Sequence, residues 1–286
     1  MVDFDNISND LAASFAEFIG TAYFVFFGVG GSVALTNNIK DTNPGVALIA
    51  GPFAWGFSLL VTVWVMAPIS GGVLNPAITI GLMVTKDIRD SNGYRLIRGF
   101  LYIIAQFLGA LLGAYLIETV QPGQSGGATT LASGTTVMEG LLLEIFCTSI
   151  LTFAVYILAI DNNADGMGAL GIGWALFISG IAAGPYTGAS LNPARTFGPA
   201  LITGDYGTAN WIYYLGPILG ALLASAFVTI FRNLGEYKET LNKLREKSHP
   251  YEIRPREPKN KAPERGYDES IQSIQIRDER TPSHIV

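Results

Sequence analysis

One stretch of this sequence is written twice, and that repetition restricts the fold more than any other feature. Residues 70–81 read S-G-G-V-L-N-P-A-I-T-I-G, and residues 187–198 read T-G-A-S-L-N-P-A-R-T-F-G. In each copy, a glycine-bearing run leads to an Asn, and a Pro and an apolar segment follow. Asn is favoured immediately before a helix, and Pro is favoured at its first position. We therefore expect two short helices, which begin at two matching boxes: Asn75, Pro76 and Ala77, and Asn192, Pro193 and Ala194.

These two helices are predicted to enter a membrane without crossing it. About ten apolar residues follow each Asn, whereas a spanning helix needs about 20. Two half-length helices at matching places in two halves of a membrane protein are typical of a transport site at mid-membrane.

The composition also indicates a membrane protein. Of the 286 residues, 49% are hydrophobic and only 14% are charged, whereas soluble domains carry about a quarter charged residues. Most of the Lys and Arg residues follow Phe231, so a polar tail is expected there. They form no basic patch interleaved with aromatic residues, so nucleic acid is not an expected partner. The single Cys147 and the two tail histidines lack the spacing of a metal site, and no metal or cofactor is expected.

Six other apolar segments are long enough to span a bilayer. The half-helices follow the second and the fifth, so the order span, span, half-helix, span occurs twice. Each repeat crosses the membrane an odd number of times, and the second is therefore inverted relative to the first. The sequence predicts an all-α membrane protein with six transmembrane helices and two re-entrant half-helices in an inverted repeat. The predicted spans cover residues 11–35, 46–66, 95–118, 137–160, 167–183 and 210–231.

The distribution of Lys and Arg predicts the orientation, because cytoplasmic loops carry more of them. It places both termini in the cytoplasm, in a plasma membrane or an intracellular vesicle membrane. The chain then divides into an N-terminal segment, a first repeat, an extracellular connecting loop, a second repeat and a largely disordered tail. The corresponding ranges are 1–10, 11–118, 119–136, 137–232 and 233–286.

The paired half-helices suggest how a neutral solute could pass while protons do not. Each helix N-terminus offers free N–H groups and about half a positive charge. The amides of Asn75 and Asn192 add donors that hold the oxygen of a water molecule, whose hydrogens must then point away. That orientation interrupts a proton wire, and the positive field opposes cations. Carbonyl groups of the non-helical runs are expected to line the path, at Gly71, Gly72, Val73, Leu74, Gly188, Ser190 and Leu191.

Three of the charged residues within the apolar part suggest a special role. Arg195 follows the second box, where the first copy has Ile78. A charge at mid-bilayer is costly, so Arg195 is expected to face a polar lumen. Glu17 and Glu144 occupy matching repeat positions. Such carboxylates suggest proton coupling, but we favour a structural role in which each accepts hydrogen bonds from the re-entrant loops.

These motifs resemble the major intrinsic protein family, the aquaporins and glycerol facilitators. The resemblance covers about residues 10–232 and includes both N-P-A boxes, A-E-F near the start and N-P-A-R-T-F-G-P-A in the second half. It implies one pore per subunit and a homotetramer. In that family, a constriction near the outer mouth selects solutes. The corresponding residues of this chain are Trp55, Gly180, Ala189 and Arg195.

The resemblance leaves the solute preference open. Strict water channels usually have His where Gly180 stands, so a widened constriction is expected, and Trp55 resembles glycerol facilitators. Three other places resemble water channels: Thr196, Ala200 and the tyrosine pair 213–214. Mercury-sensitive members have Cys where Ala189 stands, so weak mercury sensitivity is expected.

The sequence therefore predicts a passive channel for water and small uncharged solutes such as glycerol or urea, in a lipid bilayer. Gating by a cytoplasmic segment is one alternative: the tail, the N-terminal segment with Phe4, or the acidic turn at 161–166 could close the pore. A secondary transporter and a weakly conducting structural protein are others. An enzyme is not expected, because no nucleophile, metal site or acid–base set converges.

Overall fold

The computed structural model describes residues 4–39, 43–90, 93–94, 96–121, 126–161 and 166–248. Six helices in these ranges are long and apolar enough to cross a membrane. They confirm the prediction of six spanning helices. Their bounds are α1 (Phe4–Ile39), α2 (Pro44–Ser70), α4 (Leu96–Val120), α5 (Val137–Ala154) with its π-helical continuation η1 (Val155–Ile160), α6 (Gly168–Thr187) and α8 (Ile212–Asn233).

The two half-helices are α3 (Pro76–Val84) and α7 (Pro193–Thr203). Each begins after the Asn of its box, because the Asn side chain caps it. Asn75 Oδ1 accepts a hydrogen bond from the Ala77 N–H at 2.9 Å, and Asn192 Oδ1 accepts one from the Ala194 N–H at 2.9 Å. The expectation that a short helix starts at each box is confirmed.

Helix α1 begins at Phe4 and so includes most of the predicted N-terminal segment. An ion pair of 2.8 Å between Asp10 and Arg98 of α4 joins this first part of the helix to the bundle. The helix therefore extends beyond the apolar segment that hydropathy marks.

Two short features lie outside the predicted spans. Strands β1 (Arg89–Asp90) and β2 (Gly93–Tyr94) form a small antiparallel ladder before α4. The tail begins with helix α9 (Gly235–Ser248). The remainder of the tail predicted to be disordered, 249–286, and residues 162–165 of the acidic turn lie outside the described residues. Residues 1–245 form one compact unit, which contains all the contacts given below.

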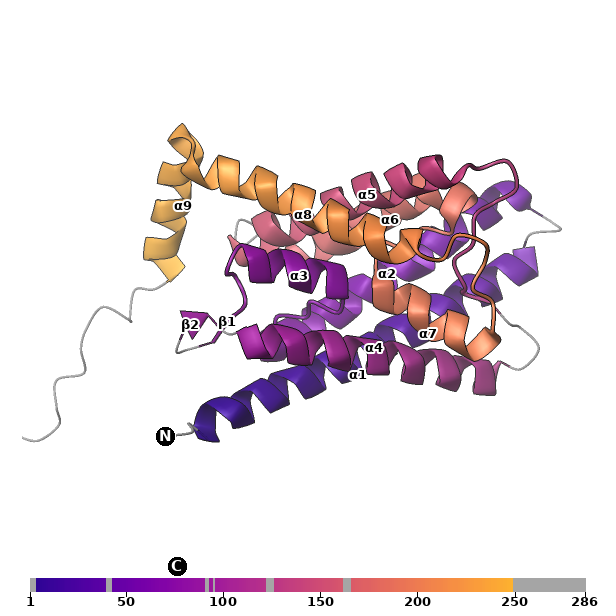
Figure 1. Cartoon of the computed structure of the whole chain (residues 1–286), viewed down its shortest axis with the longest axis horizontal. Helices are drawn as coiled ribbons and strands as arrows, with labels where there is room; N and C mark the ends of the chain where they lie inside the picture. The colour runs from indigo at the N-terminus through magenta and orange to yellow at the C-terminus, as the bar shows by residue number, and fades with distance from the viewer. Residues whose placement is uncertain are drawn as a thin grey trace, which may run out of the picture. The chain divides into compact units, whose positions relative to one another are not determined.

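Each half-helix packs mainly against a spanning helix of the other repeat. Within each repeat, the first helix packs against the other two spans, α1 on α2 and α4, and α5 on α6 and α8. However, α3 of the first repeat packs mainly against α8, and α7 of the second packs mainly against α4 (Figure 1). The contacts are close, because a Cβ added to Gly198 of α7 would lie 2.4 Å from the Ala110 carbonyl oxygen.

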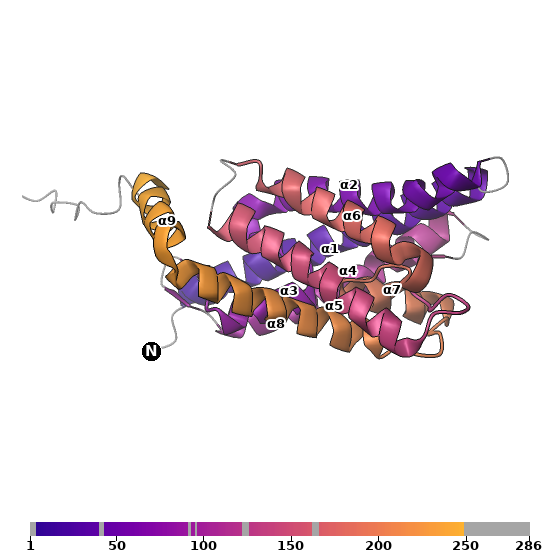
Figure 2. The ribbon, with the colours of Figure 1, turned by 90° about the horizontal axis from the view of Figure 1, so that it is seen from above.

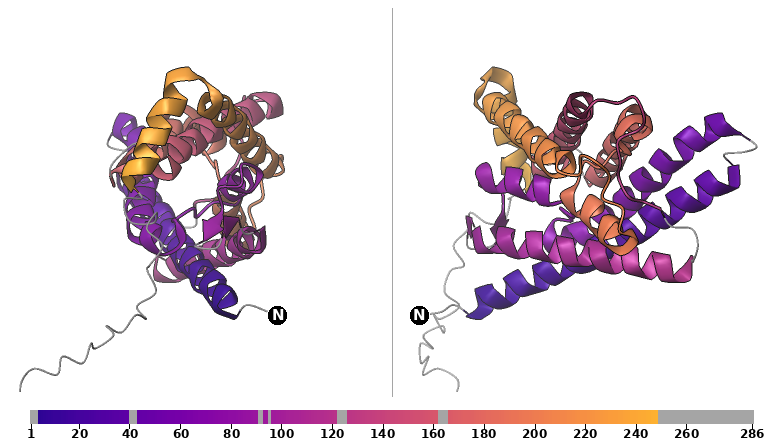
Figure 3. Two further views of the ribbon diagram at one scale, coloured as in Figure 1. Left: turned by 90° about the vertical axis from the view of Figure 1, so that its left-hand side faces the viewer. Right: turned by 45° about the vertical axis from the view of Figure 1, so that its right-hand side comes forward.

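The repeats also meet where α2 crosses α6, and these helices lie side by side in Figure 2. Gly56 and Gly173 make the approach possible, because a Cβ on either would come within 2.9 Å of the other's carbonyl oxygen. Both half-helices lie among the six spans, as the end-on view of Figure 3 shows. The arrangement directs the two N-P-A boxes toward the same region.

Candidate functional site

Three cavities adjoin one another inside the bundle. The Arg195 cavity, named after one of its lining residues, has a volume of about 270 Å³. A central cavity of about 20 Å³ lies between the boxes and is lined by both Asn75 and Asn192. The Tyr102 cavity has a volume of about 280 Å³. Leu176 lines the first two, and Val63 and Gly72 line the last two, so the series runs wide, narrow and wide.

The central cavity is framed by bonds that join the two repeats. Asn75 Nδ2 donates to the Leu191 carbonyl at 2.9 Å, and Asn192 Nδ2 donates to the Leu74 carbonyl at 2.8 Å. Since each Asn oxygen also caps its own helix, both amides are held at both ends. An amide has two N–H groups, so each Asn keeps a second donor. The Leu74 and Leu191 carbonyls, which were expected to line the path, thus also brace the boxes.

Two buried carboxylates hold the non-helical runs in place. Glu17 accepts hydrogen bonds from the N–H groups of Val73 and Leu74 at 3.0 and 2.7 Å. Glu144 accepts from those of Ser190 and Leu191 at 3.0 and 2.8 Å. Both carboxylates are fully buried. Buried N–H groups without a partner are costly, so these bonds let irregular backbone exist at membrane depth.

The runs that these carboxylates hold have unusual backbone angles. Leu74, Ala189 and Leu191 have φ of 52°, 47° and 56°, in a region that side chains with a Cβ rarely adopt. Each such residue costs on the order of 1–3 kcal/mol. Of the residues expected to line the path, Gly71, Gly72 and Val73 line the Tyr102 cavity, Gly188 lines the Arg195 cavity, and Ser190 and Leu191 line the central cavity.

The four residues expected to form a selective constriction come together. Trp55, Gly180, Ala189 and Arg195 all line the Arg195 cavity. Arg195 Nη1 donates to the Gly127 carbonyl, and Nη2 donates to the Gly188 carbonyl at 3.3 Å. The guanidinium carbon of Arg195 lies 4.3 Å from the centre of the Trp55 ring, which is a cation–π contact. Arginine has five donors, so three remain for other partners.

Comparison with known proteins shows the family of this chain. The family model described as "Major intrinsic protein" matches residues 5–228. This chain belongs to the major intrinsic protein family. As a member of it, the chain is an integral membrane protein, a channel for water or small solutes, and not an enzyme.

Individual relatives agree with that assignment. "Aquaporin-1" of Rhizophagus irregularis is 51% identical over 250 residues, which cover 86% of this chain and 88% of the relative. "Aquaporin-7" of Botryotinia fuckeliana is 39% identical over 82% of this chain, which spans about half of that relative (52%). The solved aquaglyceroporin of Plasmodium falciparum shares the fold, with a TM-score of 0.63, 24% identity, and coverage of 76% of this chain and 95% of that one.

In this major intrinsic protein, Gly180 has a packing contact as well as a place on the cavity wall. A Cβ added to it would lie 2.9 Å from Pro52 Cβ. Ordinary Cβ contacts are no closer than about 3.4 Å. A larger residue at position 180 therefore requires α2 and α6 to move apart.

Three buried hydroxyl groups form a hydrogen-bonded series near the loops that hold Arg195. The sequence did not indicate this series. The hydroxyl oxygens of Thr129 and Thr196 are 2.7 Å apart, and those of Thr196 and Ser190 are 2.6 Å apart. All three residues are buried. Thr129 also packs against Gly188, whose carbonyl accepts from Arg195. The only sequence signal was a Thr-Thr pair within a loop that we interpreted as a connection.

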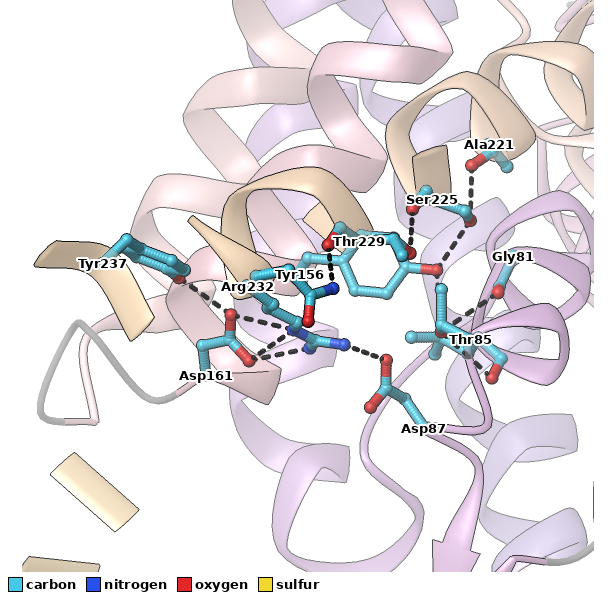
Figure 4. A network of polar contacts seen from close by, with 12 residues as sticks. Gly81, Thr85, Asp87, Tyr156, Asp161, Ala221, Ser225, Thr229, Arg232 and Tyr237 are labelled. Carbon is cyan, nitrogen blue, oxygen red and sulfur yellow. Dashed lines mark hydrogen bonds and ion pairs between the residues drawn. The ribbon is translucent and has the colours of Figure 1, made fainter. Parts of the chain in front are cut away.

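A second unforeseen network lies at the end of the bundle where α8 meets α9 (Figure 4). Arg232 pairs with Asp161 at 2.7 Å and with Asp87 at 2.8 Å. The Tyr237 hydroxyl of α9 donates to Asp161 at 2.8 Å, and the Arg232 guanidinium lies 5.5 Å from the centre of the Tyr156 ring. Asp87 lines the Tyr102 cavity. The network therefore joins the first helix of the tail to the cavity wall.

Proposed function

We propose that this chain is a passive channel for water and for small uncharged solutes such as glycerol or urea, and that it excludes protons and ions. The observation that carries this proposal is the meeting of two half-helix N-termini at a central cavity of about 20 Å³. One water molecule needs about 10–15 Å³ of such volume. Solutes therefore pass the centre in single file.

Proton exclusion follows from what the centre offers. The second N–H group of the Asn75 side chain and that of the Asn192 side chain donate to the oxygen of a water molecule. Val63, Ile78 and Leu151 line the same cavity and accept no hydrogen bond through their side chains. The water must direct its hydrogens along the file, away from the centre, so no proton can be relayed across it. The half-positive ends of both helices also repel cations.

Solute selection is assigned to the Arg195 cavity. The remaining donors of Arg195 bind solute oxygens, and its positive charge opposes cations. Trp55 and Ala189 supply apolar surface for the carbon side of a glycerol or urea molecule. The mixture of one polar and two apolar walls supports passage of water together with a small polyol.

For the orientation in the membrane and the assembly of subunits, we propose what the sequence led us to expect. We place both termini in the cytoplasm, with the Tyr102 cavity facing it and the Arg195 cavity facing outward. Assembly as a homotetramer in the bilayer is what the resemblance to the family implies. Exposed aromatic residues of α1 and α2 offer surface for contacts with lipid or with other chains. They include Tyr23, Phe27, Phe53 and Phe57.

The test is stopped-flow light scattering on proteoliposomes of the full chain, first in a sucrose gradient and then in a glycerol gradient. We expect both to exceed empty liposomes with weak temperature dependence, because a pore needs no conformational cycle. Steep temperature dependence would instead favour a transporter, and no flux in either gradient would contradict the proposal.

The role of Arg195 is tested with Arg195→Val in the same vesicles, with a pH-sensitive dye inside. Loss of the charge is expected to admit protons and to raise the ratio of glycerol to water permeability. Unchanged solute selectivity together with unchanged proton exclusion would show that Arg195 has been assigned wrongly.

A gated form of the same channel is the second candidate, and the Tyr237–Asp161 bond favours it. Through Arg232 and Asp87, this bond links α9 to the wall of the Tyr102 cavity. A chain that ends at Asn233 is expected to conduct water differently from the full chain if α9 holds that wall. Equal permeabilities of the two chains would reject gating by α9.

A further inference from the structure

The indole ring of Trp55 rests directly on the backbone of Gly28 in α1. A Cβ added at Gly28 would lie 2.3 Å from Cε3, 2.4 Å from Cζ3 and 2.8 Å from Cδ2 of that ring. Three ring atoms at such similar distances indicate contact with the flat face of the six-membered ring. Real Cβ atoms essentially never come within 3.0 Å. Position 28 therefore accepts only glycine while the ring stays where it is.

The ring separates Gly28 from the solute path. Trp55 and Arg195 line the Arg195 cavity, whereas Gly28 is buried and lies outside its lining. The Arg195 guanidinium is stacked on the ring at 4.3 Å. Phe24, one turn earlier on α1, packs edge-on against the same ring with centroids 5.2 Å apart. Gly28 and Phe24 of α1 thus support the Trp55 wall of the Arg195 cavity.

Helix α1 cannot move away to make room for a larger residue. Glycines of α4 bring the two backbones together, since a Cβ on Gly109 would lie 2.3 Å from the Phe18 carbonyl oxygen and one on Gly113 would lie 2.3 Å from that of Ala22. Close packing of this kind transmits a change of volume to whichever neighbour can move. At Gly28 that neighbour is the Trp55 side chain.

We propose that Gly28 determines the width of the passage through the Arg195 cavity, because it lets the Trp55 ring lie back against α1. This inference rests on the proposed channel function and adds a specificity-determining residue that does not touch the solute. A methyl group at position 28 moves the ring by about 1 Å, because ordinary contact begins at 3.4 Å. The ring, on which Arg195 is already stacked, then moves into the Arg195 cavity, and the passage narrows for glycerol before it narrows for water.

Gly30 provides a matched control on the same helix. A Cβ there would meet Ile117 Cδ1 at 2.5 Å, which is the far end of a flexible side chain that can turn aside. Ile117 lies outside the linings of the Arg195 and central cavities. Gly30→Ala therefore makes the same chemical change in α1 without moving the Trp55 ring.

The experiment compares the wild type, Gly28→Ala, Gly30→Ala, Trp55→Phe and the double variant Gly28→Ala/Trp55→Phe in proteoliposomes. Gly28→Ala is expected to lower the glycerol permeability about tenfold relative to water, the discrimination that one methyl group can give. Gly30→Ala should keep the wild-type ratio. The double variant should match the ratio of Trp55→Phe, because Phe lacks the larger ring system that meets the new methyl group.

An unchanged ratio in Gly28→Ala, or an equal change in Gly30→Ala, would overturn the inference. So would a double variant whose ratio is as far below that of Trp55→Phe as the ratio of Gly28→Ala is below that of the wild type. If Gly28→Ala alone does not fold, as judged by size-exclusion chromatography, a folded and conducting double variant still supports the inference, and a double variant that also fails to fold overturns it. A wild type without flux rejects the channel function instead, so the two failures are distinguishable.

Discussion

The two repeats build nearly the same half-helix entrance from different side chains. In the first, Ser70 donates to Glu17 at 2.6 Å, and in the second, Thr187 donates to Glu144 at 2.7 Å. Each hydroxyl also accepts from a backbone N–H two residues later, at 3.1 and 3.0 Å. Ser and Thr are interchangeable here because the chemistry needs one hydroxyl that donates and accepts.

The repeats differ in the residue that follows the N-P-A box. Ile78 of α3 is buried beside the central cavity, whereas Arg195 of α7 lines a wide cavity and is held by carbonyls from two loops. Since α3 forms without an arginine, the half-helix does not need one for its fold. We therefore propose that the difference between Ile78 and Arg195 serves solute selection.

The largest expected effect concerns the two buried carboxylates that hold the non-helical runs in both repeats. Glu17→Ala and Glu144→Ala each leave several buried N–H and hydroxyl donors without a partner, and each such donor costs about 1–3 kcal/mol. We expect both variants to unfold at much lower temperature than the wild type in detergent. If only one of them were destabilised, the two supports would not be equivalent.

The next effect concerns the cross-links between the repeats. Asn75→Asp and Asn192→Asp replace the Nδ2 donor with an oxygen that faces the Leu191 or the Leu74 carbonyl. We expect each to reduce water permeability about tenfold or more, and to admit cations, because the positive centre loses its donors. Water flux and a cation-sensitive dye measure the two outcomes. Wild-type values in either variant would show that its amide is dispensable.

A smaller effect should appear in the second repeat alone. Thr129→Val removes the hydroxyl that meets Thr196 but keeps the side-chain shape, so the loop carrying the Gly127 carbonyl loses one anchor. We expect the ratio of glycerol to water permeability to change about threefold, the value of a hydrogen bond worth about 0.5–1 kcal/mol. Thr129→Ser, which keeps the hydroxyl, should restore the wild-type ratio. If the Val and Ser variants had the same ratio of glycerol to water permeability, the Thr129 hydroxyl would have no role in selectivity.

The smallest effect is expected from mercury. Cys147 is buried and Ala189 offers no thiol in the Arg195 cavity, so mercuric chloride should change water permeability little. Ala189→Cys should make the channel sensitive. Strong inhibition of the wild type that survives in Cys147→Ser would contradict this expectation.

Local signals in the sequence were enough for the elements and for their order. A cap and a proline start α3 and α7, and the length of the apolar runs separates half-helices from spans. The set Trp55, Gly180, Ala189 and Arg195 came from the resemblance to the family, and the structure brings all four to one cavity. The ends of α1 and α9 were less predictable, because a polar helical turn has no apolar length to mark it.

The tertiary structure alone decided which groups meet across the repeats. The bonds from Asn75 to Leu191 and from Asn192 to Leu74 span more than one hundred residues. The positions of α3 and α7 against spans of the other repeat, the contact of Gly28 with Trp55, and the tie from Tyr237 to Asp161 are likewise set by packing. A sequence pattern reports which face of a segment is apolar. It does not report which distant backbone will approach that face, because the approach depends on the fit of all the helices together.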